Sequence, residues 1–139
     1  MTYPEPLVAP FREDLVRYGV EEARTPADVD RLVNTPGTVL MIVNSVCGCA
    51  AGRARPAVGF AMNHSTKPSK VGTVFAGADV DAVAHLRGIL ADFPPSSPSM
   101  ALFKDGKPVY MLHRREIETR DPFQIAKLLT TAFDQYCTA

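Results

Sequence analysis

Two cysteines separated by one glycine, Cys47-Gly48-Cys49, are the residues of this sequence best suited to chemistry. They lie between an apolar run at 38–43 and an alanine-rich stretch at 50–62, where a buried strand should end and a helix begin. A helix N-terminus favours a thiolate over a thiol, because its unpaired N–H groups carry partial positive charge. Cysteines at i and i+2 can close a strained disulfide across a glycine bend, and strained disulfides exchange readily. The motif therefore predicts a labile, redox-active disulfide.

Two other interpretations of the cysteine pair stay open. Free cysteine is among the most buried residue types, so the pair could simply pack in the core. The pair could also hold zinc or copper(I) together with one or more histidines. The three histidines are His64, His85 and His113. There is no second cysteine pair and no His-x-x-x-His spacing, so no metal site is predicted. Thiol–disulfide exchange is favoured over both alternatives.

Two arginines and a third cysteine are the remaining candidates. Arg53 and Arg55 follow the motif on the predicted helix and add positive field around it. Cys137 lies near the end of the sequence, where we expect it to be exposed or loosely packed. A bystander is the favoured interpretation of Cys137, and a resolving or dimer-forming thiol is the alternative.

The elements that must hold the motif alternate between strands and helices. Apolar runs predict strands at 38–43, 71–75, 100–103 and 109–112, with a short edge strand at 20–23. Asp105-Gly106 predicts a hairpin between the last two. Helices are predicted at 11–18, from a Thr25 cap onward, at 50–62 with a kink at Pro56, from an Asp79 cap to about 91, and after 121. Alternation requires parallel neighbours and the hairpin an antiparallel pair, so we expect an α/β fold with a mixed sheet between helices.

Length and composition restrict the classes of protein to which the chain can belong. The 139 residues are 46% hydrophobic and 22% charged, which fits one domain over 1–139 with an N-terminal arm and short helix at 1–18. Fifteen basic residues balance fifteen acidic ones, so no global field attracts nucleic acid or anionic lipid. No apolar run approaches the length of a membrane-spanning helix, and the first residues do not resemble an export signal. We therefore expect a cytoplasmic protein that binds neither nucleic acid nor membrane.

The redox pair at the end of a central strand resembles the thioredoxins. Pro98 lies eight residues before Gly106, where thioredoxins have a cis-proline before the penultimate strand. The resemblance implies a thioredoxin-like three-layer fold, with a central mixed β-sheet and helices on both faces. It also implies that the backbone of Ser97 faces the active cysteine, where it can pair with an extended substrate.

A closer resemblance is to the bacilliredoxin family, whose members carry a Cys-Gly-Cys motif. The resembling segments are residues 43–52, 54–57, 74–77, 95–102, 116–118 and 132–134, followed closely by Cys137. The resemblance implies a thiol–disulfide oxidoreductase that strips bacillithiol from S-bacillithiolated cytosolic proteins. It makes Cys47 the nucleophile and Cys49 the resolving cysteine. Disulfide isomerase activity has also been ascribed to the family.

The same resemblance sets the expected partners. Bacillithiol is a co-substrate, no other cofactor is expected, and the partners are S-bacillithiolated proteins and a flavin-dependent disulfide reductase for recycling. Ser97 and Pro98 would cradle the substrate, and Arg53 or Arg55 would pair with a carboxylate of the small thiol. The alternatives are a general disulfide isomerase or oxidant without preference for bacillithiol, a small metal-binding module, and a redox sensor linked through Cys137.

Overall fold

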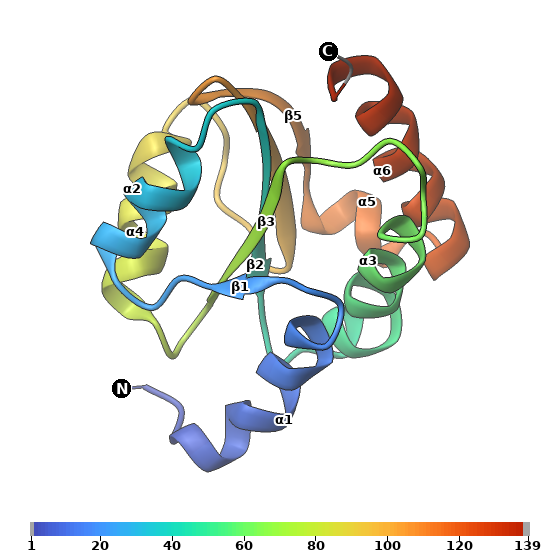
Figure 1. Ribbon diagram of the computed structural model, residues 1–139. Helices are drawn as coiled ribbons and strands as arrows, with labels where there is room; N and C mark the ends of the chain where they lie inside the picture. The colour runs from blue at the N-terminus through green and yellow to red at the C-terminus, as the bar shows by residue number, and fades with distance from the viewer. Residues whose placement is uncertain (1, 138–139) are drawn as a thin grey trace.

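The strands of the computed structural model, which describes residues 2–137, form one mixed sheet (Figure 1). In spatial order they are β1 (Glu21–Glu22), β3 (Lys70–Phe75), β2 (Thr38–Asn44), β4 (Ser99–Lys104) and β5 (Lys107–Leu112). Strands β1, β3 and β2 run parallel, whereas β4 is antiparallel to both β2 and β5. Strand β2 is therefore central, and the cysteine motif follows its carboxyl end.

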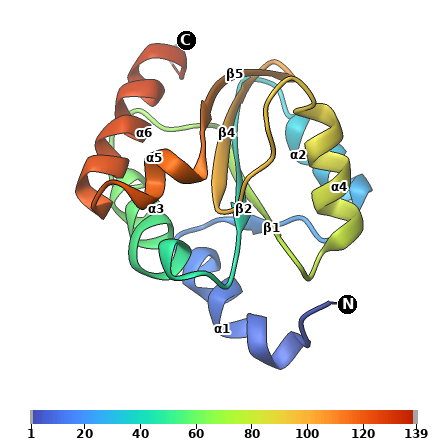
Figure 2. The same cartoon turned by 180° about the vertical axis from the view of Figure 1, so that it is seen from behind.

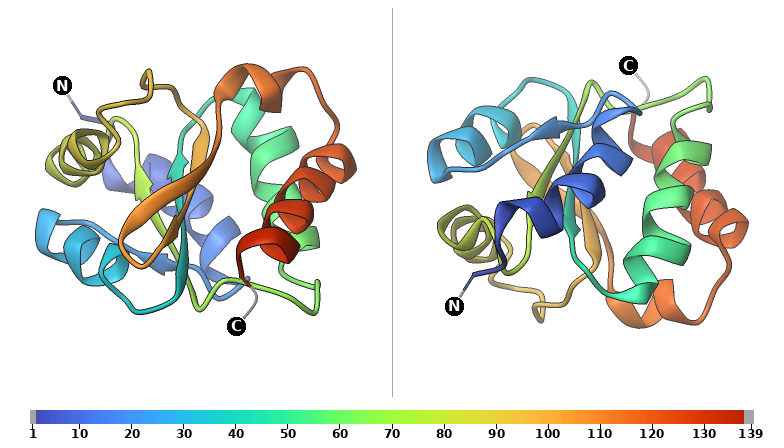
Figure 3. Two further views of the ribbon diagram at one scale, coloured as in Figure 1. Left: turned by 90° about the horizontal axis from the view of Figure 1, so that it is seen from above. Right: turned by 90° about the horizontal axis from the view of Figure 1, so that it is seen from below.

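Helices cover both faces of the sheet, as the views in Figures 2 and 3 show. One face carries α2 (Pro26–Val33) and α4 (Val80–Ile89), and the other carries α3 (Arg55–Ala61), α5 (Arg114–Glu118) and α6 (Pro122–Tyr136). Helix α1 (Glu5–Val16) lies near the carboxyl end of β2 (Figure 1). These three layers match the expected architecture. Among the described residues, no helix combines the length and apolarity needed to cross a membrane.

The sequence of strand β2 is an almost continuous apolar run, because both faces of the strand are buried. Leu40 and Ile42 pack into the core beneath α3 and α6, whereas the alternate residues Val39, Met41 and Val43 pack beneath α2 and α4. A strand held this way on both sides cannot slip by one residue without moving apolar side chains to the wrong layer. The loop that follows Asn44 therefore starts from a fixed point.

The predicted caps and turns are largely confirmed. Thr25 caps α2, because its side-chain oxygen accepts a hydrogen bond from the Asp28 N–H at 3.1 Å. The hairpin between β4 and β5 turns through Asp105 and Gly106 with φ of 50° and 84°. Two successive positive φ angles match the right-handed twist of the flanking strands.

Two helices differ from their predicted limits. Helix α1 begins at Glu5: Pro6 lies in its first turn, where N–H groups have no helical partner anyway, and the helix also contains Pro10 in its interior. The predicted helix at 50–62 is not simply kinked. Residues Ala50–Ala54 form a π-helical segment, and the α-helix begins at Arg55, with Pro56 in its first turn. Pro56 has no N–H to continue an α-helical ladder from the preceding turn, so the break comes just before it.

The expectation that the Asp79 side chain caps α4 is wrong. Its carboxylate accepts hydrogen bonds from Arg12 Nη2 and Nη1 at 2.8 and 2.9 Å, and from the Phe75 N–H at 3.1 Å. Arg12 is 6% exposed and also bonds Glu5 at 2.9 Å. This buried ion pair fastens α1 to the loop that follows β3, and a sequence separation of 67 residues hides it from local pattern analysis.

Candidate active site

Cys47 lies in a short loop between β2 and the π-helical segment. Its N–H donates to Ser45 Oγ at 3.2 Å, and its carbonyl accepts from the N–H groups of Ala50 and Ala51 at 3.0 and 3.2 Å. Cys47 and Cys49 are both half-buried thiols. The sheet thus brings the cysteine pair to the carboxyl end of its central strand, at the first turn of the helix that follows.

The pKa values of the two thiols move in opposite directions. Burial acts to raise the pKa of Cys47, but hydrogen bonds from Ser45 and from the N–H groups of Ala50 and Cys49 outweigh it, so the net pKa is lowered. The pKa of Cys49 is raised by burial and by the neighbouring Cys47, and Glu118 adds to that rise. The Cys49 Sγ lies 4.0 Å from Glu118 Oε2. Cys47 is therefore the thiol poised to ionise first.

Gly48 carries no positive φ in this dithiol form, and a Cβ built on it would meet no atom within 4 Å. Neither backbone strain nor crowding demands glycine here. Its expected role in allowing the bend applies to the disulfide form and stays a prediction.

Arg55 lies behind the cysteine loop instead of beside a bound thiol. It is 3% exposed, and its guanidinium donates to Asn44 Oδ1 at 3.1 Å, to the Ser45 carbonyl at 2.9 Å and to Asp14 Oδ2 at 3.1 Å. Every one of these contacts lies on the protein side of the loop. The expected pairing of Arg55 with a substrate carboxylate therefore needs correction: Arg55 fixes the backbone that presents Cys47.

The Arg53 side chain also points away from the cavity beside Cys47. Its Nε donates to the carbonyl of Arg120 at 3.0 Å, which joins the π-helical segment to the end of α5. It does not line the cavity beside Cys47. Its expected pairing with a substrate carboxylate stays a prediction without a supporting contact.

Ser97 reaches the cavity beside Cys47, and Pro98 follows it at the buried start of β4. The peptide bond between them is cis, the isomer that thioredoxins have at this position and that the sequence left open. Ser97 and Cys47 line one open cavity of about 260 Å³, together with Tyr3 and Gly77. The cavity lies directly against the nucleophile and has room for part of a small thiol.

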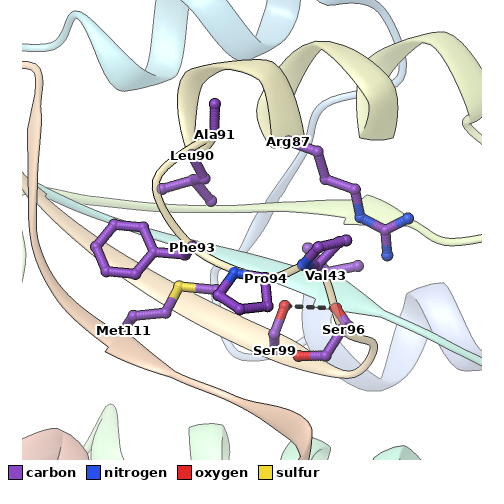
Figure 4. Close-up of a pocket in the computed structure, with 10 residues that line it drawn as sticks. Val43, Arg87, Leu90, Ala91, Phe93, Pro94, Ser96, Ser99 and Met111 are labelled. Atoms are coloured by element: carbon purple, nitrogen blue, oxygen red, sulfur yellow. Dashed lines mark hydrogen bonds between the residues drawn. The ribbon is translucent and has the colours of Figure 1, made fainter.

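The loop that carries Ser97 rests on an apolar base. A smaller cavity of about 170 Å³ lies behind it, with Phe93, Pro94 and Met111 among its lining side chains (Figure 4). At its edge the Ser99 hydroxyl donates to the Ser96 carbonyl at 2.8 Å. This bond ties the start of β4 back to the loop and helps to hold Ser97 in place.

Arg114 is a functional candidate that the sequence marks only as part of the basic cluster 113–115, for which a solvated helix start is favoured over a substrate-docking patch. Its Nη1 donates to the Ser97 carbonyl at 3.2 Å, and its Nε donates to Glu118 Oε2 at 3.3 Å. It lines the cavity beside Cys47, and its charge favours the thiolate forms of both cysteines. It lies 67 residues from Cys47 in a short basic cluster, and no sequence pattern separates it from a solvated helix start.

Comparisons with known proteins were made with this geometry in view. A family model described as disulphide isomerase matches residues 3–137. A bacilliredoxin from Koribacter versatilis is 51% identical over 99% of this chain and 95% of its own length. A bacilliredoxin from Geobacillus kaustophilus is 48% identical over 94% of this chain and 90% of its own. The chain belongs to the bacilliredoxin family. It is thus a thiol–disulfide oxidoreductase, which confirms the predicted family and enzyme class.

Solved structures confirm the fold. Thioredoxin from Malassezia sympodialis superposes with a TM-score of 0.60 at 12% identity, covering 86% of this chain and 91% of that one. Oxidised thioredoxin from Plasmodium falciparum gives 0.60 at 18% identity, covering 86% and 99%. At such low identity the likeness concerns the fold alone, and it supports the predicted thioredoxin-like α/β class.

The histidines of this bacilliredoxin are engaged away from its cysteines. His64 Nε2 lies 2.8 Å from Asp134 Oδ1, and His85 Nε2 lies 2.7 Å from Asp30 Oδ1. His113 is the N-cap of α5. Within residues 2–137, no three His, Cys, Asp or Glu side chains gather as metal ligands. The structure offers the metal-binding interpretation no ligand set.

Proposed function

We propose that this bacilliredoxin reduces mixed disulfides between bacillithiol and proteins, with Cys47 as nucleophile. The observation that carries the proposal is the placement of the Cys-Gly-Cys pair after the carboxyl end of β2, where Cys47 shares a cavity with Ser97. The lowered pKa of Cys47 and the raised pKa of Cys49 support the same assignment of nucleophile. In the first step the Cys47 thiolate attacks the bacillithiol sulfur of the mixed disulfide. A sulfur–sulfur bond forms between Cys47 and bacillithiol as the old one breaks, and the electron pair leaves on the thiolate of the released protein.

Resolution requires the second cysteine to lose its proton. Glu118, 4.0 Å from the Cys49 Sγ, is the carboxylate placed to accept it. The Cys49 thiolate then attacks the Cys47 sulfur, forms the internal disulfide and expels bacillithiol as a thiolate. A raised pKa suits Cys49, because a thiol that stays protonated does not compete with Cys47 in the first step.

The remaining roles follow from this chemistry. Ser97 and Pro98 border the substrate, and Gly48 permits the closed ring. Two electrons return the Cys47–Cys49 disulfide to the dithiol, and we assign them to a flavin-dependent disulfide reductase, with bacillithiol as the small-thiol carrier. We place residues 1–139 in one domain that acts in the cytoplasm on S-bacillithiolated proteins, without nucleic acid or membrane as partners.

The test is intact mass of the Cys49→Ala variant after incubation with a bacillithiolated protein. Without the resolving thiol, Cys47 should retain one bacillithiol while the substrate protein is released unmodified. Cys47→Ala should trap nothing, and the wild-type chain should give the internal disulfide instead. If the substrate stays modified and Cys47 stays unmodified, the proposal is wrong.

A second candidate function has support from the description of the matched family, disulphide isomerase. In that case Cys47 would attack the sulfur of a protein cysteine, and the variant would capture the substrate protein itself. Rates on scrambled ribonuclease, set against rates on a bacillithiolated protein, distinguish the two.

A further inference from the structure

Arg114 stands between the nucleophile and the residue expected to bind substrate. Its guanidinium contacts the Ser97 carbonyl on one side and lines the cavity that contains Cys47 on the other. We propose that Arg114 is a specificity-determining residue: it binds a carboxylate of the attached small thiol and keeps extended polypeptides away from Ser97. The inference rests on the proposed function, because it names what selects the substrate of that site.

The contact with Ser97 occupies part of a peptide-binding edge. A residue that pairs with an extended chain offers both its N–H and its C=O. Here the Ser97 carbonyl already accepts from Arg114 Nη1 at 3.2 Å. The carbonyl has a second lone pair, but the N–H of an extended polypeptide must approach it beside the guanidinium, whose charged hydrogen bond is the stronger one. A small thiol makes no such demand.

The cavity itself favours an anion. Of the described side chains that line it, Arg114 is the only cation and no carboxylate is present. Glu118 holds the Nε edge of the guanidinium at 3.3 Å, which fixes the plane of the group. Among residues 2–137, Nη2 makes no hydrogen bond to the protein, so it stays available to a ligand oxygen.

Arg114 also lines a second cavity of about 380 Å³, which does not include Cys47. Pro94, Pro95, Arg115 and Glu118 border it as well, and Glu118 is the carboxylate that already bonds the Nε edge of Arg114. A thiol whose sulfur lies at Cys47 must pass the Arg114 guanidinium to fill both spaces. Bacillithiol has its carboxylates on a malyl group, at the opposite end of the molecule from its cysteinyl sulfur. That polarity matches a cation placed beyond the nucleophile.

The first test compares two modified forms of one substrate protein. One form carries bacillithiol, and the other carries cysteinyl-glucosamine, which is the same thiol without the malyl carboxylates. Arg114→Met should raise KM for the first form about tenfold relative to the second, the size of losing one charged hydrogen bond. A change in the thiolate fraction of Cys47 affects both forms equally, so it cancels from this comparison. Arg114→Lys should restore part of the loss. Arg31→Met is the matched control, because Arg31 is also exposed and also bonds a carboxylate at 3.3 Å.

The second test separates anion binding from thiol acidity. The reduced protein is alkylated with iodoacetate, an anion, and with iodoacetamide, its neutral analogue. The ratio of the two rate constants cancels the thiolate fraction of Cys47. We expect Arg114→Met to lower this ratio severalfold and Arg31→Met to leave it unchanged. Arg114→Met should also increase the rate on scrambled ribonuclease, because the Ser97 carbonyl is released.

The outcomes separate the two proposals. If the wild-type chain leaves bacillithiolated protein untouched, the proposed function fails, and the alkylation ratio still tests whether Arg114 selects anions. If the wild-type chain is active but treats both modified forms alike, or if Arg114→Met keeps the wild-type KM and ratio, the role of Arg114 is overturned.

Discussion

Cys47 follows the carboxyl end of β2, whereas Cys137 packs near Thr38 at the amino end of the same strand. Six residue steps, on the order of 20 Å, separate the two ends. The pKa of Cys47 is lowered by donated hydrogen bonds that outweigh its burial. The pKa of Cys137 is raised by burial, which a hydrogen bond from Thr38 only partly offsets. The acidity of each thiol thus follows from the balance between its burial and the hydrogen bonds that it receives.

This comparison also bears on the expected roles of Cys137. The distance along β2 places it out of reach of Cys47, so it cannot resolve a mixed disulfide within the same chain. Cys137 is half-buried against the core of α3 and α6. The packing agrees with a bystander, and the linking of two chains through Cys137 stays a prediction.

The largest effect should come from replacing Cys47, with the replacement of Cys137 as the matched comparison. Cys47→Ser should lower turnover of a bacillithiolated protein by about a thousandfold or more, because the serine hydroxyl is not ionised at neutral pH. Cys137→Ser should stay within about twofold of wild type. Release of unmodified substrate, followed by mass spectrometry, measures both. A loss of activity in Cys137→Ser would contradict the separation of the two ends.

The pH dependence of alkylation should show the same contrast within one molecule. Thiolate forms as pH rises through the pKa, so a lowered pKa lets Cys47 react at lower pH, and a raised pKa delays Cys137 to higher pH. At pH 7 we expect iodoacetamide to modify Cys47 faster by more than about tenfold. Peptide mapping of the reduced wild-type chain gives both profiles. Coincident profiles would show that the local donors do not set acidity.

The hydroxyl partner of each cysteine offers a matched pair of substitutions. Ser45→Ala should raise the pKa of Cys47 and slow its alkylation at pH 7 by about tenfold, the cost of one hydrogen bond to a charged group. Thr38→Val should raise the pKa of Cys137 and leave turnover unchanged. Thiolate absorbance against pH reports both shifts. Equal turnover in Ser45→Ala and wild type would show that Ser45 does not contribute to the reactivity of Cys47.

The smallest effect concerns stability. Cys137→Ala should lower the free energy of unfolding by about 1 kcal/mol, since the sulfur packs against the core beneath α6. Cys47→Ala should change it less, because the loop is more open. Urea unfolding of the reduced proteins provides the measurement. A larger loss in Cys47→Ala would mean that the active-site loop supports the core.

Much of the fold is accessible from sequence because its signals are local. The apolar run of β2, the Thr25 cap and the Asp105-Gly106 turn depend on neighbours a few residues away. The start of α1 is not accessible, because prolines are read as helix breakers, whereas α1 has Pro6 in its first turn and Pro10 in its interior. The break before Pro56 is recognised only as a kink, because sequence does not distinguish a kink from a π-helical turn.

The candidate site likewise contains residues that the sequence identifies and residues that it does not. The cysteine pair and Pro98 are found by type and spacing, whereas the direction of the arginine side chains is not. Sequence places Arg55 about two helical turns beyond the motif, but only the packing against Asn44 shows that it points inward. Arg114 arrives from α5 through the sheet topology, which no local pattern encodes. Charged side chains are long, and their direction is decided by tertiary partners.

Tyr3 lines the cavity beside Cys47, and its N–H donates to the Gly77 carbonyl at 2.9 Å. Any affinity tag or fusion partner joined ahead of Tyr3 must therefore leave the molecule next to the mouth of the site. Assays on amino-terminally tagged protein would understate turnover with bulky substrates.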